Sequence, residues 1–273
     1  MHALPTLGLI LPPDLAPERF LPTARAAEAA GVEELWLWED CFAQSGVAPA
    51  AALLAATERI RVGLGLMPLP LRNAALTAME VATIARMFPG RFLPGIGHGV
   101  LDWMEQTGVR AASPLTLLRE HATALRSLLA GDEVSVEGRY VQLDRVQLRW
   151  PPQEVPLLVG GRRPRTLALA GELGDGLILD GGGDPATAVA TARDAIATAL
   201  GARATAGAAE PFAVVQFSPV QSDASPSEIA DVASAFAAVG ATSVPLLVLD
   251  DEGWPDAGDG VVRLARTIGA LRR

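Results

Sequence analysis

The chain has 273 residues, half of them hydrophobic, with 22 Lys and Arg against 31 Asp and Glu and a formal net charge of −9. This length and apolar content suit one large domain, or two small ones, with a sizeable buried core. The negative charge disfavours binding to nucleic acid phosphates and to anionic membrane surfaces. A single cysteine, Cys41, excludes an internal disulfide and fits the cytosol.

The N-terminus has no positive segment ahead of its apolar residues, so we expect no signal peptide. Apolar runs such as residues 47–56 are far shorter than the ~20 residues of a membrane-spanning helix. The histidines and the cysteine lack zinc spacing, and no Gly-x-x-x-x-Gly-Lys-Ser/Thr loop for phosphate occurs. We therefore expect a cytoplasmic protein with no metal, no membrane span and a small-molecule substrate.

Strand-like and helix-like segments alternate along the chain. Short apolar strands are predicted at residues 7–11, 35–38, 61–66, 92–96, 156–159, 176–179, 212–217 and 244–249. Helical segments are predicted at residues 17–30, 48–57, 74–88, 114–130, 164–173, 185–200, 226–238 and 260–271, the fourth capped by Ser113.

Two stretches interrupt this alternation. Residues 134–136 and 140–143 flank Glu-Gly-Arg, which predicts a β-hairpin inserted between the fourth and fifth β-α units. The Ala- and Gly-rich stretch 201–209 predicts a flexible loop.

Eight β-α units predict a (β/α)8 TIM barrel, for which about 250 residues is typical. The strands are uniformly apolar, as buried parallel strands are. A doubly wound open sheet is the alternative, but its Gly-x-Gly-x-x-Gly fingerprint after the first strand is missing. No linker divides the chain, so we expect a single domain over residues 1–273, with its site at the strand C-terminal ends.

The loop after the fifth strand reads Gly160-Gly161-Arg162-Arg163-Pro164-Arg165 and opens a helix. Backbone N–H groups at a helix start favour anions, and arginine adds charge and bidentate donors. Cations at this end of a helix oppose its dipole, which favours a bound phosphate or carboxylate over the alternative of a solvated basic turn.

Adjacent carboxylates, Glu39 and Asp40, end the second strand. Neighbouring side chains on a strand point to opposite faces, so the two do not form a paired acid/base dyad. We expect one to enter the barrel mouth as a ligand or catalytic group. The other is expected to cap a helix or to pair with an arginine.

Glycines lie within the third strand, at Gly63 and Gly65, and glycine within a strand marks a bulge or a close backbone approach. The fourth strand ends in Gly97-His98-Gly99. On its own, His98 is either a packed or hydrogen-bonded residue or a catalytic one. His121, within a well-formed helix, is expected to be structural.

Four stretches at these strand ends resemble the luciferase-like monooxygenase superfamily, and in particular its deazaflavin (coenzyme F420)-dependent branch related to methylenetetrahydromethanopterin reductase. They are LWLWEDCF, ATERIRVGLGLMPLPLRNAALTAMEVATIARMFPGRFLPGIGHG, EGRYVQL and VPLLVGGRRPRTLALAGELGDGLIL. Together they run across nearly the whole chain in the family's order. The resemblance implies a (β/α)8 barrel with an insertion, in agreement with the alternation of elements.

The resemblance also implies roles by position. A bulge at the end of the third strand, often with a non-proline cis peptide, backs the flavin ring in the family, and Gly65-Leu66 takes that place. The other positions implied to hold cofactor are Met67, Arg72, Gly97, His98, Gly99, Gly160, Gly161, Arg162, Arg163 and Arg165, the last five around the phosphate-bearing tail. Glu39, Asp40 and His98 are the candidate proton donors.

The function implied is hydride transfer between F420 and a small organic substrate. FMN is the alternative cofactor, in a monooxygenase supplied by a partner flavin reductase. Barrels of this family are often homodimers, and the sequence leaves the oligomeric state open. Asp40 stands where luciferases have histidine, which argues against light emission. A non-catalytic flavin-binding barrel and an unrelated phosphosugar enzyme remain open.

Overall fold

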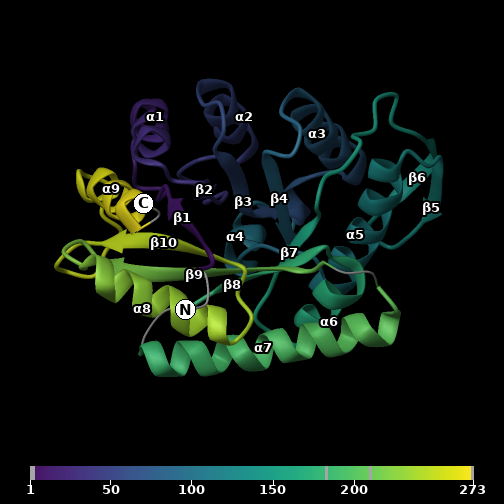
Figure 1. Cartoon of the computed structure of the whole chain (residues 1–273). Helices are drawn as coiled ribbons and strands as arrows, with labels where there is room; N and C mark the ends of the chain where they lie inside the picture. Colours follow the sequence, from purple (N-terminus) through teal and green to yellow (C-terminus); the bar gives the residue numbers. More distant parts are fainter. Residues whose placement is uncertain (1–3, 182–183, 209–210, 272–273) are drawn as a thin grey trace.

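The computed structural model describes residues 4–181, 184–208 and 211–271. His2, and residues 182–183 after the sixth predicted strand, lie outside this range. Eight parallel strands close into a barrel in the order β1-β10-β9-β8-β7-β4-β3-β2 (Figure 1). They are β1 Thr6–Ile10, β2 Glu34–Leu37, β3 Arg61–Pro68, β4 Phe92–Gly97, β7 Leu158–Gly160, β8 Gly176–Asp180, β9 Ala213–Gln221 and β10 Ser243–Leu249. The predicted (β/α)8 barrel is confirmed.

Helices surround the barrel (Figure 1). They are α1 Phe20–Ala30, α2 Val47–Ala56, α3 Ala74–Met87, α4 Leu101–Gln106, α5 Pro114–Ala130, α6 Pro164–Leu173, α7 Pro185–Ala206, α8 Pro226–Ala238 and α9 Gly260–Leu271, with 3-10 turns η1 Pro17–Arg19 and η2 Leu69–Leu71. The short helix α4, in the loop after β4, was not predicted. At six residues it is too short to show a helical period.

The insertion is a separate antiparallel hairpin of β5 Val134–Glu137 and β6 Gln142–Val146, which lies beside α5 (Figure 1). Its second strand begins two residues later than predicted. The carboxylate of Glu120 on α5 accepts hydrogen bonds from the backbone N–H groups of Arg139, Tyr140 and Val141, at 2.7–3.0 Å. These N–H groups are therefore held in the turn and do not pair in the ladder.

Side chains fill the interior of the barrel. Trp36 is fully buried there, and its ring lies edge-on to Phe217 at 5.4 Å. Gly63 gives this indole its space, because a Cβ at Gly63 would collide with the ring. Below it, buried Glu34 accepts hydrogen bonds from the Trp36 indole N–H at 2.8 Å and the Ser243 hydroxyl at 2.6 Å. Any ligand site must therefore lie above this filled core, at the strand C-terminal ends.

Two local predictions are wrong. The predicted flexible loop 201–209 is helical through Ala206, and α7 ends only where Gly207 takes a left-handed conformation, with φ of 65°. Alanine-rich sequence favours helix strongly enough to carry the chain through Gly201. Ser113 does not cap α5 with its side chain; its hydroxyl lies 2.7 Å from that of Thr116 instead.

Replacing Gly201 with alanine is expected to stabilise the protein by about 0.5–1 kcal/mol, because glycine inside a helix loses more backbone entropy than alanine. A Cβ at Gly201 meets nothing within 4 Å. Urea denaturation followed by circular dichroism measures the change. The matched control Gly207→Ala should destabilise by about 1–2 kcal/mol, since its left-handed φ disfavours a side chain. Equal effects of both changes would contradict the helix.

Candidate functional site

The end of β2 places its two carboxylates on opposite sides of the barrel wall. Trp36 and Trp38 belong to the interior cluster, and the Trp38 indole N–H donates to Oδ2 of Asp40 at 3.2 Å. Asp40 is therefore the carboxylate that reaches the barrel mouth. Glu39 turns outward, as the alternation along a strand requires.

Glu39 has a structural role. Its side chain is 5% exposed and makes a bidentate ion pair with Arg72, with Nη2 to Oε1 at 2.7 Å. Oε1 also accepts from the backbone N–H of Gly46, the residue before α2, at 2.9 Å. This geometry confirms that one carboxylate pairs with an arginine, and it argues against a catalytic role for Glu39.

Arg72 is held on two sides. Besides Glu39, its Nε donates to Oε2 of Glu80 at 3.0 Å, and its side chain is only 13% exposed. Two carboxylates already neutralise this guanidinium. Arg72 therefore acts as a structural brace, meaning that it links the loop after β3 to Glu39 and Glu80. This argues against the predicted contact between Arg72 and cofactor carboxylates.

A tight turn follows Asp40. Asp40 and Gln44 exchange both backbone hydrogen bonds, at 3.2 and 3.1 Å, across a turn that contains a cis peptide between Cys41 and Phe42. Burial, followed by the nearby charges of Asp40 and Glu39, raises the pKa of the Cys41 thiol. A raised pKa disfavours the reactive thiolate, so Cys41 is not a candidate nucleophile.

The end of β3 has the bulge expected from the resemblance. The pairing of β3 with β4 shifts register between Leu64 and Met67, and the peptide bond between Gly65 and Leu66 is cis. Met67 is fully buried and belongs to the main core cluster, not to the interior cluster around Trp36, which argues against the predicted cofactor contact. The half-buried Leu66 is the side chain of this bulge that the neighbouring strand ends meet.

Glycines from two neighbouring strands pack around Leu66. A Cβ at Gly97 or at Gly160 would collide with the Leu66 side chain, and one at Gly161 would collide with Thr166. These three glycines therefore serve packing within the protein in the first place. The close approach of a flat ring to their backbone stays a prediction.

The basic loop before α6 has one paired arginine. Arg162 makes a bidentate ion pair with Asp180 at the end of β8, with Nε to Oδ1 at 2.5 Å, and the two side chains are 74% and 49% exposed. Arg163, the residue before α6, makes no side-chain cap of the helix. Arg163 and Arg165 are exposed, and among the described residues neither has an ion pair. Their role as cofactor contacts stays a prediction.

His98 lies half-buried at the end of β4, and its Nδ1 is 2.9 Å from the carbonyl oxygen of Gly99. Gly99 has φ of 70° and packs near Pro68 and Met104. Within the described part of the chain, no hydrogen bond or ion pair joins His98 to Asp40. The two thus stand as separate proton-donor candidates.

His121 connects α5 to the loop after β3. It is buried, with Nδ1 3.0 Å from the Leu117 carbonyl oxygen and Nε2 3.4 Å from that of Arg72. Burial lowers the pKa of His121 below its ordinary value of 6.5, against the carbonyl contacts, which favour the charged form. The predicted structural role fits this setting.

The stability of the protein is expected to fall as the pH drops below about 6.5. Because burial lowers the pKa of His121 in the folded state below that in the unfolded chain, the unfolded state binds more protons in this range. One such proton changes the free energy of unfolding by up to about 1.4 kcal/mol per pH unit. Urea denaturation at pH 7.5 and 5.5 measures the slope. His121→Gln should lower it; an unchanged slope would assign the pH dependence to other groups.

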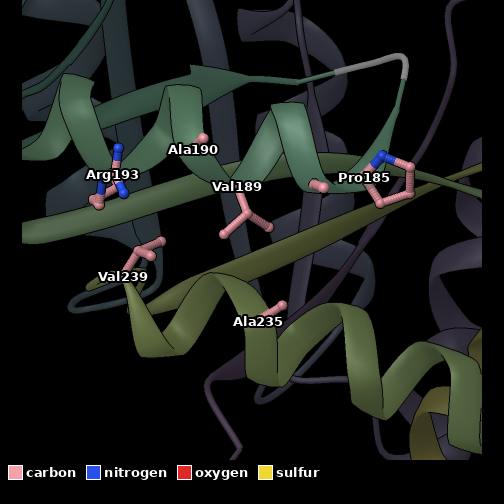
Figure 2. Close-up of a pocket in the computed structure, with 7 residues that line it drawn as sticks. Pro185, Val189, Ala190, Arg193, Ala235 and Val239 are labelled. Carbon is pink, nitrogen blue, oxygen red and sulfur yellow. The ribbon is translucent and has the colours of Figure 1, made fainter.

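Two surface hollows lie outside the barrel mouth. One runs between α7 and α8 and is lined by apolar residues such as Val189 and Val239, with Arg193 at its edge (Figure 2). The other lies beside η2 and includes Arg72, His121 and Tyr140. Neither contains Asp40 or the arginines before α6. Among the described residues, no helix is both long and apolar enough to span a membrane.

The closed parallel barrel, with polar groups at the strand C-terminal ends, defines a (β/α)8 barrel protein whose candidate ligand site is the mouth. Residues 6–259 match the luciferase-like monooxygenase family, and the chain belongs to this family.

Named relatives agree with the branch that the motifs indicated. The 5,10-methylenetetrahydromethanopterin reductase of Methanolobus tindarius is 28% identical over 157 residues, which are 58% of this chain and 48% of the reductase. The F420-dependent glucose-6-phosphate dehydrogenase of Kineococcus radiotolerans is 32% identical over 183 residues, 61% of this chain and 53% of the dehydrogenase. The chain spans about half the length of the curated relatives it matches.

Solved structures share the fold. The coenzyme F420 dependent tetrahydromethanopterin reductase from Methanopyrus kandleri superposes with a TM-score of 0.80 at 18% identity, over 98% of each chain. The monooxygenase RslO1 from Streptomyces bottropensis superposes with a TM-score of 0.78 at 17% identity, over 97% of this chain and 98% of its own. At these identities the likeness shows the fold alone.

Sequence reasoning missed two residues beside Asp40, Trp38 and Gln44. Trp38 orients Asp40, and Gln44 faces Asp40 across the turn. The alternation of Trp36 in β2 with Trp38 directly after the strand was the available signal for the first. No sequence signal points to Gln44, because its position depends on the shape of the turn.

Proposed function

We propose that this protein is an oxidoreductase that transfers a hydride between F420 and a small organic substrate at the barrel mouth. The observation that carries the proposal is the arrangement of one mouth-facing carboxylate, Asp40, at the same strand-end face as the basic start of α6. An acid for proton transfer and cations for an anionic tail are the two features that such chemistry requires from the protein. The F420-dependent relatives support the choice of cofactor.

The residues of the mouth fit such a group. The bulge at Gly65-Leu66, with Gly97 beside it, would lie against the ring. Arg162, Arg163 and Arg165 would hold the phosphate-bearing tail. When bound, the deazaflavin supplies the carbon that carries hydride. Asp40, oriented by Trp38, is placed to hold or deliver a proton at the substrate.

A fluorescence titration of the purified protein with F420, FMN and riboflavin tests the proposal. Saturable binding of F420, and its oxidation or reduction when a substrate panel is added, is expected. Binding of neither F420 nor FMN would overturn the proposal. Binding without turnover of any donor or acceptor would favour a non-catalytic flavin-binding barrel.

FMN is the second candidate, because the oxygenating constituent of a Baeyer-Villiger monooxygenase in complex with FMN is among the structures that share the fold. FMN presents a single phosphate to the loop before α6, and an FMN enzyme would take reduced flavin from a partner reductase. Tighter binding of FMN than of F420, with oxygen consumption on supply of reduced FMN, would select it. The homodimer and the reductase partner stay predictions.

A further inference from the structure

Gln44 shares a face of the turn with Asp40. The two residues form an antiparallel bridge in which each backbone N–H donates to the other's carbonyl oxygen, at 3.2 and 3.1 Å. Directly opposed residues in such a pair project their side chains to the same side, with Cβ atoms about 5 Å apart. Since Asp40 faces the mouth beside Trp38, the pairing directs the Gln44 side chain toward the same face.

The carboxamide of Gln44 has no partner among the described residues. Both its Nε2 and its Oε1 are shielded from solvent, and neither makes a hydrogen bond within them. A buried amide without a partner costs free energy, so such groups are rare unless a ligand or water satisfies them. By contrast, Glu39 and Arg72, which brace the same turn, have hydrogen-bond partners for their side chains.

The groups beside Gln44 indicate which kind of ligand could satisfy its carboxamide. A glutamine amide presents one acceptor and a donor side by side, which matches another amide in a two-point pair. Asp40 beside it disfavours an anionic group at the same place. The middle of the turn carries Phe42, which is 71% exposed and offers an apolar contact.

We propose that the turn from Asp40 to Gln44 is a recognition element for a neutral amide-type group, meaning a carboxamide, lactam or imide, attached to an apolar body. Gln44 is its specificity-determining residue. The proposal rests on the proposed function for the location of the site. It adds the ligand chemistry, which neither the family nor the relatives assign to this chain.

Two sources can supply this chemistry. A substrate can present a carboxamide or lactam, and the pyrimidine-dione edge of a flavin or deazaflavin ring presents an imide. A small probe that carries only the amide and an apolar ring separates the recognition from the rest of either molecule. Benzamide is such a probe, and methyl benzoate is its match without a donor.

The test measures binding of benzamide and methyl benzoate to the full chain by ligand-observed NMR, for the native protein, Gln44→Leu and the control Gln142→Leu on the exposed hairpin. The native protein should bind benzamide about tenfold more tightly than methyl benzoate, as expected for loss of one or two neutral hydrogen bonds. Gln44→Leu should remove this discrimination, and Gln142→Leu should retain it. Equal affinities in the native protein, or discrimination retained in Gln44→Leu, would overturn the proposal.

Thermal unfolding separates recognition from a structural role. Because Gln44 has no partner inside the protein, Gln44→Leu should leave the unfolding midpoint unchanged or raise it. A midpoint lowered together with lost discrimination would overturn the proposal, since it would show an internal partner.

Cofactor titration then distinguishes the sources and the two proposals. Benzamide displaced by FMN or F420 assigns the amide to the cofactor ring, and benzamide bound alongside them assigns it to a substrate; either supports recognition by Gln44. Failure of both cofactors to bind would remove the proposed function, while the Gln44 discrimination would still be measured independently.

Discussion

Arg72→Leu is expected to destabilise the protein by about 3–5 kcal/mol, among the largest effects of any single change at the site. The substitution removes the partner of Glu39, whose carboxylate is 5% exposed, and leaves a buried charge without compensation. It also removes the partner of Glu80, whose side chain is 24% exposed. Urea denaturation at pH 7.5 measures the loss. Cofactor binding should weaken with it, because the turn that carries Asp40 is held through Glu39 and Gly46.

Three variants test this explanation. Glu39→Gln keeps an acceptor for the Gly46 N–H and leaves Arg72 its bond to Glu80, so it should cost only about 1–2 kcal/mol. Glu39→Leu combined with Arg72→Leu should cost less than the sum of the single changes, because no buried charge remains unpaired. Arg119→Leu breaks the exposed pair with Glu172 and should cost at most about 1 kcal/mol. An Arg72→Leu cost as small as that of Arg119→Leu would contradict the brace.

The barrel was predictable because its signals are local. Each apolar strand and each helix shows its own period and its own end residue, and eight repeats leave little choice of fold. The hairpin was predictable for the same reason. Its register was not, since it depends on Glu120, which reaches the turn from α5, about twenty residues earlier in the chain.

Only one feature of the site was predictable, namely the alternation of side chains along a strand. That rule placed Glu39 and Asp40 on opposite faces but did not say which one enters the mouth. Which carboxylate enters the mouth depends on Arg72, 33 residues further on, because its ion pair holds the Glu39 side chain away from the mouth. The glycines at 97 and 160 show the opposite limit: their motif drew attention to a ligand, whereas their nearest neighbour is Leu66 from another strand. Contacts between distant residues decide such roles, and one sequence does not reveal them.

The double change Arg162→Ala with Arg163→Ala is expected to weaken binding of F420 and FMN by about 10- to 100-fold. A charge-assisted hydrogen bond to phosphate is worth about 1.5–3 kcal/mol, and exposure of both side chains reduces the total. Arg162 shares its charge with Asp180, so Asp180→Asn should tighten binding a few-fold by releasing it. Fluorescence titration at two salt concentrations measures both effects, and the native affinity should fall more steeply with salt than that of the double variant.

Matched changes of charge and of ligand isolate the tail contact. Arg263→Ala with Arg266→Ala on α9 removes the same two positive charges from a helix that lacks the Gly-Gly start, and it should leave affinity nearly unchanged. Riboflavin and the deazaflavin riboside lack the phosphate, so their affinities should not respond to the loss of Arg162 and Arg163. If the double variant lost affinity for FMN and riboflavin equally, the two arginines would contact the ring or support the fold, and would not bind the phosphate. Unchanged affinity for FMN and F420 would remove the loop before α6 from the cofactor site and leave the mouth around Asp40 as the part to be explained.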